Sequence, residues 1–275
     1  MSLSKVFFLS SEIEPFSSSC SISSFSQLFG AQIKKNKEVD IRMCQPKYGY
    51  ISERKYVLRE VIRLKNLEID FAPKNRVTNL KSAFIPHSRV QVYFMEDEEF
   101  FQPVPELLYK SRNGRIFSNN HLKFAYFAKS ILVALKKLYW PPEVVVSNDW
   151  QMSFVPIVGR KIFKNDDFYK GIKYVYILHS YDNMKKVDKD VFKSLNLQSK
   201  DFELNDNHLN AIRNSDFTII LNDIKNPIVK KIQKNKKLNS ELATLKKKHK
   251  IYDIDYSSDD INEKIDKIVE DVRSL

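Results

Sequence analysis

Glycine is scarce in this chain, with five among 275 residues. Glycine lets a backbone approach a phosphate group closely, and neither a P-loop nor the glycine fingerprint of dinucleotide-binding folds is present. Any phosphate-binding role must therefore do without close backbone approach. No serine sits in a glycine-flanked elbow either, which argues against a Ser-His-Asp hydrolase.

Cysteine is also scarce, and long apolar runs are absent from the sequence. The two cysteines, Cys20 and Cys44, cannot build a disulfide framework, and neither they nor the five histidines have the spacing of metal ligands. No apolar run approaches the ~20 residues that a membrane-spanning helix needs. We therefore expect reduced thiols, no metal site, no cofactor, no membrane partner and a cytoplasmic location.

Positive charge is in excess, with a formal net charge of +12. Such an excess can indicate a nucleic-acid partner. However, lysines are spread over the whole chain, and the one dense stretch, residues 225–250, alternates with apolar residues in the rhythm of a helix with a solvated face. We therefore disfavour nucleic acid as a partner. Nucleic-acid binding, if present, would weaken steeply with salt.

Short apolar runs mark the expected strands. Val6 to Leu9 has the length and composition of a strand buried on both faces, at the centre of a parallel sheet. Further apolar strands are predicted at residues 39–43, 144–146, 174–178 and 217–221. Helical spacing of apolar residues predicts helices over residues 25–37 and 121–138. This alternation predicts an α/β fold with a doubly wound parallel, Rossmann-like sheet.

Two regions depart from the alternation. Exposed antiparallel strands, forming an inserted β-hairpin region, are expected over residues 55–95, and residues 102–120 are expected to form a binding loop. The chain is divided into a domain of residues 1–223 and a C-terminal extension of residues 224–275. We expect this extension to hold one lysine-rich helix, a strand at 251–256 and a final helix that packs back on the same domain.

Polar residues follow three strands that are expected to be neighbours. They are Ser11-Glu12, Asn148-Asp149-Trp150 and His179. Because the carboxyl ends of adjacent parallel strands open into one crevice, these groups should lie together. A carboxylate, an aromatic wall and an imidazole suit a sugar site. Simpler interpretations stay open: Asp149 as a helix N-cap, Trp150 as a core residue and His179 as a structural residue.

Several motifs occur together, in order, over most of residues 5–222. They are residues 5–16, Pro46-Lys47-Tyr48-Gly49, Tyr109, Asn119-Asn120 with Lys123-Phe124-Ala125, residues 148–151, and Ile177-Leu178-His179-Ser180. In this combination the chain resembles the N-terminal catalytic domain of bacterial glycogen synthases and starch synthases. That family consists of retaining glycosyltransferases in which two Rossmann-like domains face each other.

The resemblance implies a function and a set of site residues. It implies glucosyl transfer from a nucleotide sugar such as ADP-glucose to an α-glucan acceptor. Asp149 and His179 would lie nearest the chemistry. The sugar-facing residues would be Glu12, Tyr109, Asn148 and Trp150.

The chain also departs from the family. Where the family has Lys-Thr-Gly-Gly-Leu and an aspartate, this sequence has a degenerate phosphate loop that includes Ser18, Cys20, Ser21 and Ser24. About fifty residues after Asn222 would not supply the family's second, donor-binding domain. One hypothesis is therefore a glycosyltransferase half that handles a nucleotide sugar only when another chain completes the cleft. The alternative is a non-catalytic glucan-binding or protein-interaction domain.

Overall fold

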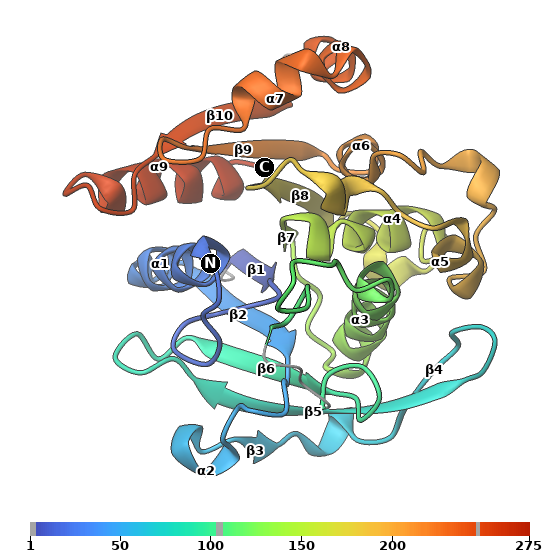
Figure 1. Ribbon diagram of the computed structural model, residues 1–275. Helices are drawn as coiled ribbons and strands as arrows, with labels where there is room; N and C mark the ends of the chain where they lie inside the picture. Colours follow the sequence, from blue (N-terminus) through green and yellow to red (C-terminus); the bar gives the residue numbers. More distant parts are fainter. Residues whose placement is uncertain (1–3, 103–106, 246–247) are drawn as a thin grey trace.

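The computed structural model describes residues 4–102, 107–245 and 248–275. Within these residues, ten strands form a sheet in the order β10-β9-β8-β7-β1-β2-β6-β5-β3, with β4 paired to β5 (Figure 1). The strands are β1 (Ser4–Leu9), β2 (Val39–Pro46), β3 (Arg59–Glu60), β4 (Leu67–Ile69), β5 (Arg76–Phe84), β6 (Gln91–Glu96), β7 (Val144–Asn148), β8 (Lys173–Leu178), β9 (Phe217–Asp223) and β10 (His249–Ile254). The strands from β10 to β6 are parallel, which confirms the predicted α/β fold.

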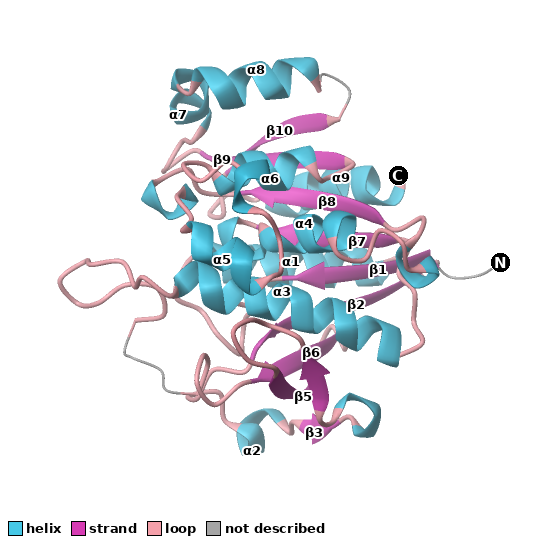
Figure 2. Ribbon diagram, turned by 90° about the vertical axis from the view of Figure 1, so that its right-hand side faces the viewer, coloured by secondary structure: helices cyan, strands magenta, loops and turns pink. Residues whose placement is uncertain are grey.

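Helices cover both faces of this sheet. They are α1 (Ser21–Lys35), α2 (Glu53–Tyr56), α3 (Asn120–Lys137), α4 (Phe154–Lys161), α5 (Lys189–Ser194), α6 (Asn207–Arg213), α7 (Val229–Lys234), α8 (Lys236–Thr244) and α9 (Ile261–Arg273). Helices α1 and α9 lie on one face, and α3 to α6 lie on the other (Figure 1, Figure 2). No helix in the described parts of the chain has both the length and the apolar character needed to cross a lipid bilayer.

Strand β1 is central, as predicted. It pairs with β2 on one side and β7 on the other, and Val6 to Leu9 are at most 1% exposed. Strands buried on both faces need apolar residues at consecutive positions, which is why this short run identified the centre of the sheet. The loop that leaves β1 therefore starts at the sheet edge where β7 and β8 also end.

The expected hairpin region is only partly correct. Strand β6 is antiparallel to β5 but parallel to β2, so it is a buried strand of the main sheet and not an exposed hairpin strand. Within residues 55–71 only β3 and β4 form. Left-handed backbone at Val57 and Asn66 interrupts the polar and apolar alternation there.

Helix α1 begins at Ser21, four residues before the predicted start. Serine hydroxyls bond to backbone carbonyls at this helix start: Ser23 Oγ donates to the carbonyl of Cys20, and Ser26 Oγ donates to that of Ile22. The serine-rich run is thus divided between a loop and the start of a helix.

The C-terminal segment differs from the prediction of one lysine-rich helix. Two helices, α7 and α8, are separated by Asn235, whose backbone is extended. The strand that follows, β10, adds a parallel edge strand beside β9, and residues 246–247 of the lysine-rich stretch lie outside the described residues. Helix α9 contacts α1, and its apolar side chains, including Ile265 and Ile268, are buried.

Candidate functional site

A cavity of about 520 Å³ lies where β1, β7 and β8 end. Four segments line it: the start of α1, residues 107–116, the turn after β7 and the turn after β8. The structure brings many of the predicted site residues to this cavity. Those that line it are Cys20, Ser21, Tyr109, Asp149, Trp150 and His179. This is the position at which open parallel sheets bind ligands.

Asp149 connects the ends of β7 and β8. Its Oδ1 accepts hydrogen bonds from the backbone N–H groups of His179 and Ser180, both at 3.0 Å, and its Oδ2 accepts from Ser180 Oγ at 2.6 Å. Burial raises the pKa of Asp149 to about 6, although the hydrogen bonds from Ser180 and His179 act in the opposite direction. Its side chain makes no capping bond to the helical turn that follows, so the N-cap interpretation is wrong.

The backbone of Asp149 is itself unusual. Its φ is 61° and its ψ is −171°, a combination that residues with a side chain rarely adopt. Its N–H donates to the carbonyl of Ile177 at 2.7 Å, which fixes the turn against β8. Backbone strain of this kind is concentrated at functional sites, and nothing in the sequence reveals it.

His179 presents a neutral imidazole at the cavity. Burial lowers its pKa to about 3, and its ring packs edge-on against Phe25 with the centroids 4.8 Å apart. Its Nε2 is buried and has no hydrogen-bond partner among the described residues. A buried ring nitrogen without a partner is costly, which makes His179 a candidate to bind a ligand hydroxyl.

Trp150 and Tyr109 form an aromatic wall. Trp150 is 4% exposed and packs edge-to-face on Tyr109, His121 and Phe124, at centroid distances of 5.5, 5.4 and 5.4 Å. Trp150 is therefore mainly a core residue with one edge at the cavity. Tyr109 is joined to the loop after β1, because its hydroxyl donates to Glu12 Oε1 at 2.8 Å.

Glu12 does not line the cavity. It is fully buried, and its carboxylate accepts from Ser17 Oγ at 3.0 Å and from both the N–H and the Oγ of Ser19 at 2.6 Å. Together with Tyr109, these donors enclose the carboxylate. Glu12 therefore organises the loop that forms one wall of the site.

The four residues that were predicted to form a degenerate phosphate loop have different surroundings. Cys20 and Ser21 line the cavity, whereas Ser18 and Ser24 donate to Glu14 Oε1, at 2.6 and 3.2 Å. Burial and the nearby Glu12 carboxylate raise the pKa of Cys20 far above that of a free thiol, so Cys20 is not a nucleophile at neutral pH. Serine hydroxyls of this loop thus donate hydrogen bonds to two carboxylates, those of Glu12 and Glu14.

Asn148 lies behind the cavity wall. It is fully buried, and its Nδ2 donates to Ser10 Oγ at 3.3 Å and to Ser26 Oγ at 3.2 Å, which ties β7 to β1 and α1. Its neighbour Gln151, which was not predicted as a site residue, does line the cavity. Gln151 is 1% exposed, and its Oε1 has no partner among the described residues. Its place directly after Asp149 and Trp150 was the only signal for it in the sequence.

A larger groove of about 740 Å³ lies along β5 and β6, away from these residues. Its basic side chains are paired with acidic ones: Arg76 pairs with Asp97 and Glu99, both at 3.0 Å, and Lys47 pairs with Glu53 at 3.1 Å. Within the described ranges of the chain, no three His, Cys, Asp or Glu side chains are gathered to hold a metal ion. The cavity beside Asp149 is therefore the candidate site.

The chain is similar in sequence to proteins of one family. Residues 5–221 match the family model of the starch synthase catalytic domain. The glycogen synthase of Chlorobium luteolum is 29% identical over 191 residues, which cover 70% of this chain and 39% of that protein. The glycogen synthase of Chlorobaculum parvum is 28% identical over 209 residues, which cover 73% of this chain and 42% of that protein.

A solved structure shares the fold. The catalytic domain of starch synthase IV from Arabidopsis thaliana, bound to ADP and acarbose, matches with a TM-score of 0.72 at 15% sequence identity, over 91% of this chain and 51% of that chain. The chain thus spans less than half the length of these curated relatives and about half of this structure. On the strength of residues 5–221, the chain belongs to the starch synthase catalytic domain family and is a glycogen/starch synthase-like glycosyltransferase domain.

Proposed function

We propose that this chain binds the end of an α-glucan in the cavity beside Asp149, as the acceptor half of a synthase-type glucosyl-transfer site. We further propose that residues 1–275 alone do not transfer glucose from a nucleotide sugar. The observation that carries the second statement is the loop after β1. Its serines close around Glu12, and residues 10–24 contain no lysine or arginine to bind a phosphate.

The chemistry of the cavity suits a neutral sugar. The edges of Trp150 and Tyr109 offer apolar surface for a ring face, and Asp149, His179 and Gln151 offer polar groups for hydroxyls. With a pKa of about 6, Asp149 is mostly ionised at pH 7 and can accept a hydrogen bond from a sugar hydroxyl. We place Asp149 and His179 beside the terminal glucose, nearest to the position where transfer would occur.

The chemistry at the start of α1 is poorly suited to a phosphate. Glu12 already accepts the N–H of Ser19 beside that helix terminus, where an anion would otherwise be stabilised. A serine hydroxyl in place of a lysine forfeits roughly 1–3 kcal/mol of phosphate binding. A nucleotide sugar would therefore need contacts from elsewhere.

We propose that a second chain supplies those contacts when transfer occurs. ADP and acarbose are ligands of the Arabidopsis domain, whose matched region is about half of that chain. For the present protein, ADP-glucose would then be a substrate only in a completed cleft. The cytoplasm is the compartment in which we expect this to happen.

The test is release of ADP from ADP-glucose in the presence of glycogen. The purified chain alone should give none, whereas cell extract that contains a completing partner should give release that disappears with the Asp149→Ala variant. The exposed Asp201→Ala variant is the matched control and should behave as wild type. Turnover by the purified wild-type chain would contradict the proposed inactivity.

A further inference from the structure

The turn that carries His179 and Ser180 is held from two sides. On one side Asp149 accepts the three hydrogen bonds described above. On the other side, the next residue, Tyr181, is 5% exposed, and its hydroxyl donates to Asp206 Oδ2 at 2.5 Å. Since His179, Ser180 and residues 182–184, on either side of Tyr181, line the cavity, this second anchor bears on the shape of the site.

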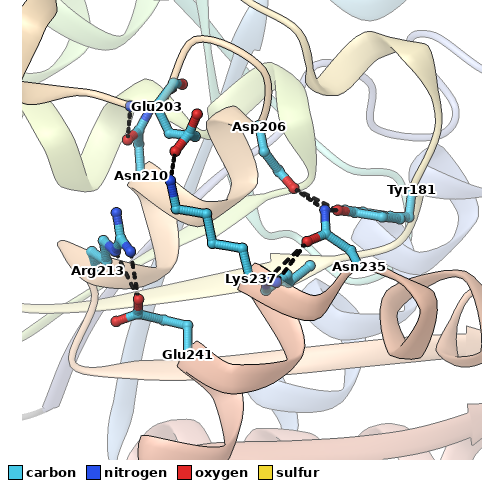
Figure 3. A network of polar contacts seen from close by, with 9 residues as sticks. Tyr181, Glu203, Asp206, Asn210, Arg213, Asn235, Lys237 and Glu241 are labelled. Carbon is cyan, nitrogen blue, oxygen red and sulfur yellow. Dashed lines mark hydrogen bonds and ion pairs between the residues drawn. The ribbon is translucent and has the colours of Figure 1, made fainter.

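Asn235, between α7 and α8, completes the second anchor (Figure 3). Its Nδ2 donates to Tyr181 Oη at 2.5 Å and to Asp206 Oδ2 at 3.2 Å. Its Oδ1 accepts from the backbone N–H groups of Lys237 and Leu238, both at 3.1 Å. One side chain therefore caps α8 and binds the wall of the cavity at the same time.

In this network each donor meets an acceptor. Burial and the adjacent Asp206 carboxylate raise the pKa of Tyr181, so its hydroxyl stays protonated and donates to Asp206. The same oxygen can then accept from the Asn235 amide. Donors and acceptors that alternate in this way reinforce one another in a buried network.

Helix α8 is held firmly enough to present Asn235. Lys237 pairs with Glu203, and Arg213 donates to Glu241 Oε2 at 2.7 and 2.8 Å, so α8 is attached to the segment before α6 and to the last residue of α6 (Figure 3). Leu238 is fully buried and Leu242 is 6% exposed. Asn235 lies beyond residues 5–221, the part of the chain that matches the family.

We propose that Asn235 is a positioning residue for the candidate site. By binding Tyr181 and Asp206 it holds residues 179–184 in place and so keeps Ser180 and His179 against Asp149. The C-terminal segment thereby acts as the outer support of the cavity. The identity of the ligand, a glucan end, rests on the proposed function, whereas the positioning role of Asn235 does not.

The test separates capping from positioning. Asn235→Asp keeps the oxygen that caps α8 but removes the amide donor and places a second carboxylate beside Asp206. Residue-resolved amide hydrogen exchange should be about tenfold faster at His179 and Ser180 and unchanged at Lys237 and Leu238. Asn239→Asp, which adds the same charge at an exposed position of α8, should stay within about twofold of wild type.

Unchanged exchange at His179 and Ser180 in folded Asn235→Asp would overturn the proposal. Should that variant not fold, Tyr181→Phe carries the test, because it removes the hydroxyl and leaves the α8 cap intact. Its expected result is the same faster exchange, and unchanged exchange would again overturn the proposal.

Affinity for maltoheptaose should fall about fivefold in Asn235→Asp. A wild-type chain that binds no maltoheptaose would contradict the proposed function while the exchange result still decides the role of Asn235.

Discussion

At the scale of single residues, Asp149 has the most unusual surroundings in the site. It is fully buried, it accepts three hydrogen bonds from residues 179–180, and its backbone has a positive φ. A backbone of this kind costs about 1–3 kcal/mol and persists only where the surrounding structure fixes it. The carboxylate is thus held rigidly at the cavity.

Asp149 should make stability depend on pH. Its pKa rises from 3.8 to about 6 on folding, because burial disfavours the charged form. The folded protein therefore holds this proton more tightly than the unfolded chain, and the resulting stabilisation is present below about pH 4 and lost as pH rises through 6. Relative to Asp149→Asn, wild type should lose about 2 kcal/mol of unfolding free energy between pH 4 and 7. Urea denaturation of both proteins across this range measures it.

The control for this experiment is Asp201→Asn, which changes an exposed carboxylate. Its pH profile should run parallel to that of wild type. Parallel profiles of wild type and Asp149→Asn would show that the buried carboxylate does not titrate as described.

Glu12 offers a second test, of the loop after β1. Glu12→Ala removes a fully buried carboxylate that Ser17, Ser19 and Tyr109 share as their acceptor, so the unfolding free energy should fall by about 3 kcal/mol. Glu14→Ala, in the same loop, removes more exposed contacts and should cost no more than about 0.5 kcal/mol. Equal losses in the two variants, measured by chemical denaturation, would contradict the central role given to Glu12.

The sequence could identify these residues but not their partners. Glu12, Asp149 and His179 follow strands, and that position alone predicted that they would gather at one edge of the sheet. Whether a carboxylate faces the cavity or is enclosed by serines depends on how residues 17–20 fold back, which no local pattern determines. No local pattern shows that Gln151 faces the cavity either, so Gln151 was missed.

At the scale of helices and strands, runs of consecutive apolar residues predicted the central strands correctly. The runs at β1, β7, β8 and β9 are strands because a parallel sheet covered on both faces buries every side chain. Pairing was harder to predict, since β6 is antiparallel to one neighbour, β5, and parallel to the other, β2. The break at Asn235 was missed because its side-chain partners lie far away in the sequence.

Helix α9 should contribute to the core. Ile268 is fully buried in the layer formed with α1, so Ile268→Ala should lower the unfolding free energy by about 2–4 kcal/mol. Lys267→Ala, at an exposed neighbouring position, should change it by no more than about 0.5 kcal/mol. Thermal and urea denaturation compare the two variants. An Ile268→Ala protein as stable as Lys267→Ala would mean that α9 is only loosely attached.

At the scale of the whole molecule, the structure joins the segment before residue 223 to the segment after it. Strand β10 extends the same sheet beside β9, and α8 is bonded to the wall of the candidate site. The division into residues 1–223 and 224–275 remains a prediction. The match to the starch synthase catalytic domain family, by contrast, lies within the first of these segments.

The central claim is that the cavity beside Asp149 binds the end of an α-glucan. Its most direct test is the affinity of the purified chain for maltoheptaose, measured by calorimetric titration for wild type, Asp149→Ala and Asp201→Ala. We predict binding by wild type and Asp201→Ala, with an affinity about tenfold or more lower in Asp149→Ala, because a hydrogen bond to a charged group is lost. Equal affinities in wild type and Asp149→Ala, or no binding by wild type, would contradict the claim.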